Sequence, residues 1–446
     1  MRYLSHTEED IQRMLETIGI KDIDSLFKSI PKALRLQEEL KIPDAMDELT
    51  LKSFFENKTM LSNKTCFLGA GLYKHFVPVV VTQLLSRGEW LTAYTPYQAE
   101  ASQGTLQSIF EFQTVVANIY GSDIANASIY DASTALVEAI LMTLRVTRKK
   151  SVIIPKNINP GYRDVCFTYS EMCEFNIIEV PYNDSTGCID IDNFEQVLKI
   201  NKDIGSLVYQ FPNFFGCLEN QKEVIDTAHK YKTLAIAVNP DPLVFGITEP
   251  PGLLGADVVV GEGIGLCPFT GMGSPGLGLF ATKKKFTRSL PGRLVGMTRD
   301  INRKRSFVLT LATREQHIRR DRATSNICSN NNLNALAFLI TVSLYGKKGF
   351  FDMAQDNLLR NIYFRKSLKN SQRVKIKYGK HFFNETLLEF NNIRAMNKFI
   401  KVMQDNNIVP GLDLNPLFSK LNKHLLVCIT ELNTIGEIDL MIKELI

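Results

Sequence analysis

The 446-residue sequence has no uninterrupted run of about 18 apolar residues, which argues against a membrane-spanning helix. Acidic residues stand early in the N-terminal stretch, which lacks the apolar core of a signal peptide. The eight cysteines include no CxxC pair and the six histidines are dispersed, so neither a disulfide framework nor a zinc site is indicated. We therefore expect a cytoplasmic protein with reduced thiols, no bound metal and no membrane partner.

An excess of charge is also missing. The formal net charge of +5 is too small to indicate nucleic-acid binding by itself. The densest group of arginines lies between residues 291 and 328, where acidic residues are interspersed and few aromatic residues could stack on bases. A solvated basic face accounts for this segment, but a charged subunit interface or an acidic partner fits it better than nucleic acid.

Three regions differ in their pattern of apolar residues. Residues 1–65 predict a helical arm that begins near Thr7. Residues 66–345 predict a large α/β domain with a mostly parallel sheet, because short strands rich in Val and Ile alternate with helices. Residues 346–446 predict a small α+β domain. The expected strands of the large domain are Ser151–Pro155, Phe175–Tyr182, Ile204–Pro212, Thr233–Pro240 and Asp257–Gly263.

Two stretches of this α/β region have the composition of ligand sites. Residues 133–146 predict a buried helix. Ser133 and Thr134 either only cap it or also leave free N–H groups that hold an anion. Residues 255–282 are rich in glycine, which lets backbone approach a ligand or another chain. Gly271–Gly276 matches a dinucleotide fingerprint, but a strand rather than a helix is expected after it, so dinucleotide binding is not indicated.

Further candidate residues lie on two loops. Tyr94, Tyr97 and Gln98 surround Pro96 on a loop before a helix, where aromatic residues recognise a ligand or partner, or else join the core. Asn213 follows a strand, at the sheet edge where open α/β folds bind ligands, and the alternative is a structural turn in which Phe214 and Phe215 cover the core.

Seven stretches, in order along the chain, resemble the P-protein family of the glycine cleavage system, and most closely the α subunit of its two-chain bacterial form. They are FLGAGLYKHFVP, AYTPYQAEASQGTLQSIFEFQT, SIYDASTALVEA, QFPNFFGCLE, GADVVVGEG, PGRLVGMT and TREQHIRRDRATSNIC. The resemblance implies the aspartate-aminotransferase-like fold of pyridoxal-phosphate enzymes (fold type I), with a large α/β domain and a small C-terminal α+β domain.

In catalytic members of this family a lysine near the glycine-rich turn holds pyridoxal phosphate covalently. Here no lysine lies between Lys232 and Lys283, and Lys283–Lys285 come only after the next strand. The resemblance therefore implies that this chain anchors no cofactor. The resemblance also implies that a homologous β subunit supplies the lysine and that the assembly is α2β2, and the isolated chain is expected to be inactive.

The complex is expected to decarboxylate glycine and to pass the aminomethyl group to the lipoylated H-protein. Within this chain, Tyr94, Tyr97 and Gln98 are the first candidates to reach the partner's pocket, and His75 and Asn213 are second choices because each also has a simple structural role open to it. Two alternatives remain at this point: a free-standing pyridoxal-phosphate enzyme, and a scaffold or regulator that kept the fold without activity.

Overall fold

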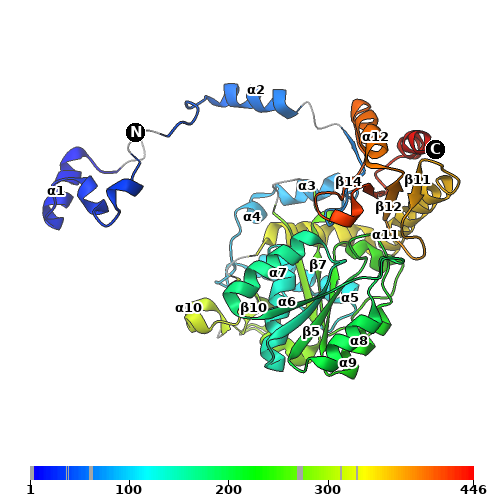
Figure 1. Cartoon of the computed structure of the whole chain (residues 1–446). Helices are drawn as coiled ribbons and strands as arrows, with labels where there is room; N and C mark the ends of the chain where they lie inside the picture. Colours follow the sequence, from blue (N-terminus) through cyan, green and yellow to red (C-terminus); the bar gives the residue numbers. More distant parts are fainter. Residues whose placement is uncertain are drawn as a thin grey trace. The chain divides into compact units, whose positions relative to one another are not determined.

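The computed structural model describes residues 5–36, 38, 40–59, 64–268, 275–311, 314–327 and 330–446. The chain divides into two compact units, Met1–Ser62 and Asn63–Ile446. The first unit, blue in Figure 1, contains α1 (Glu8–Ile18) and α2 (Glu48–Thr59). Thr7 and Asp10 cap α1 reciprocally, as the sequence predicts.

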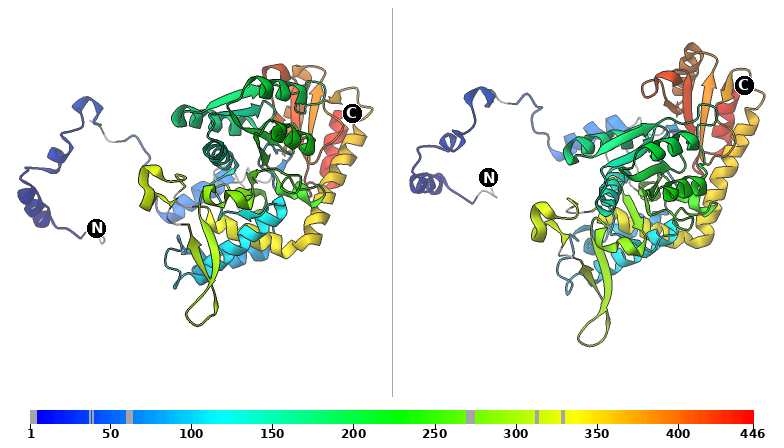
Figure 2. Two further views of the ribbon diagram at one scale, coloured as in Figure 1. Left: turned by 90° about the horizontal axis from the view of Figure 1, so that it is seen from below. Right: turned by 60° about the horizontal axis from the view of Figure 1, so that its bottom comes forward.

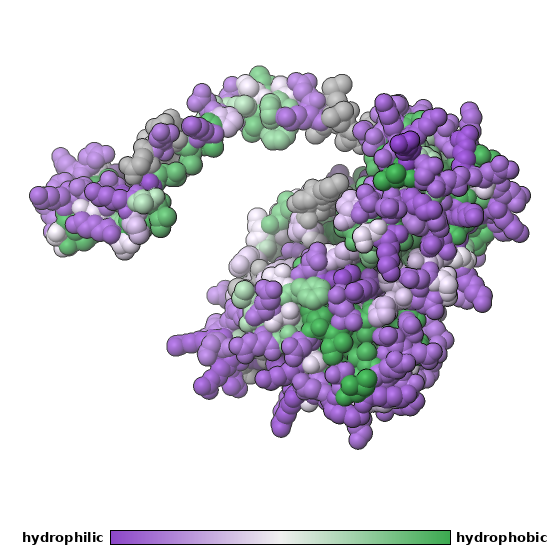
Figure 3. Space-filling model, in the orientation of Figure 1, coloured by the Kyte–Doolittle hydropathy of each residue, from purple (hydrophilic) through white to green (hydrophobic). Residues whose placement is uncertain are grey.

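The first unit buries very little. Leu15 is the one buried apolar residue among its described positions, and many large apolar side chains are exposed, including Phe27, Leu36 and Phe54. Green apolar atoms accordingly lie at the surface of this unit in Figure 3. An arm of this kind has no core that could stabilise it alone.

A seven-stranded sheet in the order β2-β8-β7-β6-β5-β3-β4 forms the centre of the second unit. The five strands β3 to β7 run parallel, and β8 and β2 are antiparallel to their neighbours. All five strands expected from the sequence are present, so the mostly parallel sheet is confirmed. The strands are β2 (Ile124–Ala125), β3 (Ser151–Pro155), β4 (Asn176–Val180), β5 (Ile204–Gln210), β6 (Leu234–Asn239), β7 (Val258–Glu262) and β8 (Gly278–Thr282).

Helices cover both faces of this sheet, which is why its strands are apolar at successive positions. Val258 and Val260 pack in one cluster with α6 (Ala132–Thr147), whereas Val259 packs in a second cluster with residues of α5 (Gln103–Tyr120) and α11 (Asn332–Ser367). The helix predicted over residues 133–146 is therefore buried, as expected. Figure 1 shows these layers, with α7 (Pro160–Cys173), α8 (Ile191–Ile200) and α9 (Gln221–Lys230) also packed around the sheet.

The C-terminal region contains a second, antiparallel sheet in the order β11-β12-β15-β14. The boundary predicted between residues 345 and 346 falls inside α11, where Gly346 leaves helical geometry with φ 58°. The prediction that residues 346–446 form a separate small domain remains a prediction. The elements after α11 are β11 (Val374–Ile376), β12 (Glu385–Phe390), α12 (Ile393–Asp405), β13 (Ile408–Val409), β14 (Leu412–Asp413), β15 (His424–Cys428) and α13 (Ile435–Leu445).

The arginine-rich segment follows β8 and forms a hairpin of β9 (Leu294–Arg299) and β10 (Arg305–Thr310). In both views of Figure 2 this yellow-green hairpin projects from the body of the second unit. Phe307 at its base is buried and contacts Phe110 of α5. In the described parts of the chain no helix is long and apolar enough to cross a membrane.

Candidate functional site

The start of α6 meets the carboxyl end of β7, where the N–H groups of Ala132 and Thr134 already have carboxylate partners. The Asp131 carboxylate caps the helix and accepts from the Thr134 N–H at 2.8 Å. The Glu262 carboxylate accepts from the Ala132 N–H at 3.1 Å and from Leu277 N–H at 2.7 Å. Burial raises the Glu262 pKa to about 7 despite these hydrogen bonds.

These contacts correct the expectation for Ser133 and Thr134. The hydroxyls of both residues donate to the Asp131 carboxylate, so Asp131 rather than either of them is the N-cap. The N–H groups of Ala132 and Thr134 are not free, as an anion site would require. The start of a helix alone would attract a phosphate. Here a phosphate would also be repelled by the carboxylates of Asp131 and Glu262.

The glycines near the end of β7 accommodate this chain's own atoms. A Cβ at Gly261 would collide with the Asn239 carbonyl oxygen and the Tyr120 hydroxyl. A Cβ at Gly265 would lie 2.6 Å from the Tyr73 carbonyl oxygen. At these two positions glycine therefore permits close packing between segments of one chain. Residues Gly271–Ser274 of the fingerprint match lie outside the described residues, and the strand expected after it is β8.

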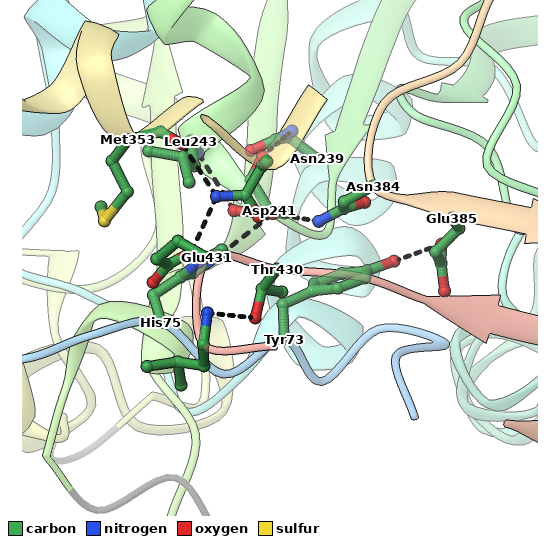
Figure 4. A network of polar contacts seen from close by, with 12 residues as sticks. Tyr73, His75, Asn239, Asp241, Leu243, Met353, Asn384, Glu385, Thr430 and Glu431 are labelled. Atoms are coloured by element: carbon green, nitrogen blue, oxygen red, sulfur yellow. Dashed lines mark hydrogen bonds and ion pairs between the residues drawn. The ribbon is translucent and has the colours of Figure 1, made fainter. Parts of the chain in front are cut away.

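His75 is buried between two carboxylates at the carboxyl end of β6 (Figure 4). Its Nε2 lies 3.2 Å from Asp241 Oδ2, and its Nδ1 lies 3.0 Å from Glu431 Oε2. Asn384 donates to the same Asp241 oxygen at 2.8 Å, and Asn357 donates to Glu431 at 2.7 Å. The contacts join the segment before α3 (Val79–Leu85) to β6 and to the segment after β15.

Electrostatics favour a charged imidazole at His75. Burial lowers its pKa, but Asp241 and Glu431 outweigh burial and raise the pKa to about 10. The Glu431 pKa falls to about 2, because the nearby His75 charge outweighs burial. His75 is therefore a buried cation that links sequence-distant segments, and its contribution to an active site stays a prediction.

A second buried contact lies beside this one (Figure 4). The Tyr73 hydroxyl donates to Glu385 Oε2 at 2.8 Å, and the Ala70 N–H donates to Glu385 Oε1 at 2.6 Å. Burial raises the Glu385 pKa to about 7. Nothing in the sequence pattern marked Glu385, Asp241 or Glu431, since each is a single acidic residue without a motif.

Asn213 organises the turn after β5. Its Nδ2 donates to the Gly187 carbonyl oxygen at 2.9 Å and to Glu219 Oε1 at 2.7 Å. Its Oδ1 accepts from the N–H groups of Phe215 and Cys217. With its amide fully engaged and buried, Asn213 fits the structural alternative and not a ligand contact.

The loop of Tyr94, Tyr97 and Gln98 is exposed, in contrast to the sites above. Tyr94 is 77% exposed and Tyr97 58% exposed, while Pro96 between them is buried. A cleft of about 340 Å³ lies along the loop, lined by Tyr94, Pro96 and the asparagines that begin α11. The alternative that these tyrosines join the core is therefore excluded.

Arg293 supports this loop and was missed by the sequence analysis, which treated the arginines of residues 291–328 as one surface group. Its Nη2 donates to the Tyr97 hydroxyl oxygen at 3.0 Å, and its guanidinium lies 5.4 Å from the centre of the Tyr97 ring. Arg293 itself is only 7% exposed. The one sequence feature that distinguishes Arg293 from the other arginines is its position directly after Pro291 and Gly292, in a turn.

The residues present do not fit covalently held pyridoxal phosphate. No amine lies between Lys232 and Lys283. Lys283 pairs with Asp257 at 2.8 Å and donates to the Gly255 carbonyl oxygen, at the amino end of β7 and away from the glycine-rich turn. The start of α6 carries carboxylates. Among the described residues, no group of three or more His, Cys, Asp and Glu side chains is placed to hold a metal ion.

Comparisons with known proteins agree over the whole length of the chain. A family model described as "Glycine cleavage system P-protein" matches residues 1–445. A relative from Geobacillus kaustophilus is 43% identical and one from Bacillus subtilis 42% identical, with 100% of this chain and 98% of each relative covered. Both are named "Probable glycine dehydrogenase (decarboxylating) subunit 1".

Solved structures lead to the same group. An inhibitor-bound glycine decarboxylase (P-protein) is similar with a TM-score of 0.84 and 35% identity, over 100% of this chain and 99% of that one. An alanine–glyoxylate aminotransferase from Nostoc sp. is similar with a TM-score of 0.58 at 15% identity, over 93% and 98% of the chains, which shows the shared fold alone. The fold is that of fold type I pyridoxal-phosphate enzymes, and the chain belongs to the glycine cleavage system P-protein family.

Proposed function

We propose that this chain is the subunit of a two-chain glycine decarboxylase that lacks the cofactor-binding lysine, and that a homologous second subunit holds pyridoxal phosphate. One observation carries the proposal: the residues at the expected cofactor position include carboxylates and no amine. The cofactor supplies the electron sink for decarboxylation when it is bound in the partner. This chain's own residues contribute by positioning substrate and excluding water.

The arm before residue 62 supports an obligate assembly. Its exposed apolar side chains would cost free energy in water and would be stabilised against a partner surface. We propose an α2β2 heterotetramer, in which each α–β contact buries well above about 2,000 Å². The lipoylated H-protein would take the aminomethyl group from this complex, and the free thiols among the described cysteines support a cytoplasmic location.

The exposed loop is the part of this chain that we assign to the partner's pocket. Tyr94, Tyr97 and Gln98 lie on one exposed turn, and Pro96 fixes the local backbone so that ordering the two rings costs little entropy. We propose that these residues hold the glycine carboxylate or shield the bound cofactor from water. The free-standing enzyme and the inactive scaffold are both disfavoured by full-length similarity to proteins named as subunits of a decarboxylating enzyme.

Borohydride reduction tests where the cofactor is held. Borohydride fixes pyridoxal phosphate permanently to the lysine that holds it, so mass spectrometry then identifies the chain. We expect one adduct on the second subunit of the reduced complex, and no stoichiometric adduct on this chain, either in the complex or when it is incubated alone with the cofactor. A stoichiometric adduct on any lysine of this chain, Lys283 included, would contradict the proposal.

A further inference from the structure

Arg293 is a buried cation without a counter-charge among the described residues. Its Nε has no hydrogen-bond partner, and its only side-chain hydrogen bond to a described residue is the one from Nη2 to Tyr97. Outside the described residues, Glu39 of the N-terminal unit is the single carboxylate in the sequence. A buried guanidinium normally carries a carboxylate partner, because removing its charge from water is costly.

The position of Arg293 is fixed from both sides of its turn. Asn126 donates to the Pro291 carbonyl oxygen at 3.0 Å, and Arg314 donates to the Gly292 carbonyl oxygen at 2.9 Å. The Ala127 N–H donates to the Arg293 carbonyl oxygen at 2.9 Å. The side chain is therefore held against Tyr97 by a backbone that has little freedom to move.

This contact decides what the Tyr97 hydroxyl can do. Because its oxygen accepts from Arg293, its proton is left to donate, and no described residue accepts it. The cation behind the oxygen polarises the O–H bond and makes an anion the preferred acceptor. His317, whose ring centre lies 6.2 Å from that of Tyr97, adds a second side chain that confines the ring.

We infer that Arg293 is a positioning residue that acts through Tyr97, directing the Tyr97 proton to the carboxylate of the substrate. The inference rests on the proposed function, in which Tyr97 faces the partner's pocket. The carboxylate of glycine loses its charge as carbon dioxide forms. A direct guanidinium pair would stabilise the substrate more than the transition state and slow the reaction, whereas a neutral hydroxyl between the two charges binds the carboxylate with a smaller penalty.

The test compares Arg293→Gln with the unchanged complex of both subunits, using glycine–bicarbonate exchange. We expect the KM for glycine to rise about tenfold with kcat changed less than about twofold, because substrate binding is lost and not bond-making. Arg293→Lys keeps the cation and should stay within about threefold of the original KM. In a Tyr97→Phe background, Arg293→Gln should add less than about twofold, since the two residues act in series.

Methylamine provides a matched ligand without a carboxylate. Its inhibition constant should not change in Arg293→Gln if only carboxylate recognition is lost. Arg299→Gln is the matched protein control, because it removes an exposed guanidinium from the same hairpin, one that donates to the Arg303 carbonyl oxygen and not to Tyr97. It should leave the glycine KM unchanged even if it lowers the melting temperature.

Three results would be decisive against these expectations. An active complex with an unchanged glycine KM in both Arg293→Gln and Tyr97→Phe overturns the inference and leaves the proposed function standing. A joint rise in the glycine KM, the methylamine inhibition constant and the subunit dissociation constant also overturns the inference. It would show that the residues contact a carboxylate of the second subunit and not that of the substrate. An unsubstituted complex without exchange activity refutes the proposed function itself.

Discussion

Replacing His75 with glutamine is expected to lower the free energy of unfolding by about 3–5 kcal/mol, the usual effect of removing one partner from a buried ion pair. The imidazolium lies 3.2 Å from Asp241 and 3.0 Å from Glu431. Glutamine can donate to one of these carboxylates, but it supplies no positive charge. Two buried carboxylates would then repel each other across a contact that joins β6 to the segment after β15.

His229 offers a matched control for this substitution. It also pairs with an aspartate, at 2.7 Å from Asp257, but its side chain is 38% exposed. Water screens such a pair, so His229→Gln should cost no more than about 1 kcal/mol. Urea unfolding of both variants measures the difference, and equal losses in the two variants would show that burial of the His75 charge is unimportant.

Acidification from pH 9 to pH 6 is expected to raise the melting temperature by about 3–6 °C. Burial raises the pKa of Glu219, Glu262 and Glu385 to about 7, and two carboxylates raise the His75 pKa to about 10. Each folded-state pKa exceeds the ordinary value of its group, so each group binds protons more tightly in the folded chain. Stabilisation therefore grows as the pH falls from 10 toward 6.5 for His75, and from 7 toward 4.5 for the three glutamates.

The gain should reverse in stronger acid. The Glu431 pKa is lowered to about 2 by His75, so its contribution is present above pH 4.5 and is lost as the pH falls further. Calorimetry across pH 4 to 9 would locate the maximum. Glu385→Gln keeps an acceptor for Ala70 N–H and Tyr73 and removes one titrating group, so it should flatten the rise between pH 7 and 5. A melting temperature that falls steadily from pH 8 to pH 6 would refute this assignment of charges.

The sheet was predictable because its signal is local. β3 and β7 are short apolar runs that are separated in the sheet by β5 and β6, yet each is recognisable from its own five residues. The same holds for α6, whose apolar character on all sides indicates burial. The position of Tyr94 and Tyr97 on an exposed loop was one of two stated alternatives, because tyrosine is common both in cores and at surfaces.

The buried charges could not be predicted because their partners are far apart in the sequence. His75 meets Asp241 and Glu431 across 166 and 356 positions, and no spacing rule connects residues at such separations. The start of α6 illustrates a related limit. Ser133 and Thr134 have the right identity for caps, but Asp131 takes that role and Glu262 arrives from the end of β7.

Glycine–bicarbonate exchange with separate and combined subunits tests the central claim most directly. The claim is that this chain contributes residues to a site whose lysine and cofactor belong to a second chain. We predict no exchange by this chain alone, even with added pyridoxal phosphate, and exchange at least about a thousandfold above that background when the second subunit is co-expressed with it. Full activity of this chain alone, or of the second subunit alone, would contradict the account.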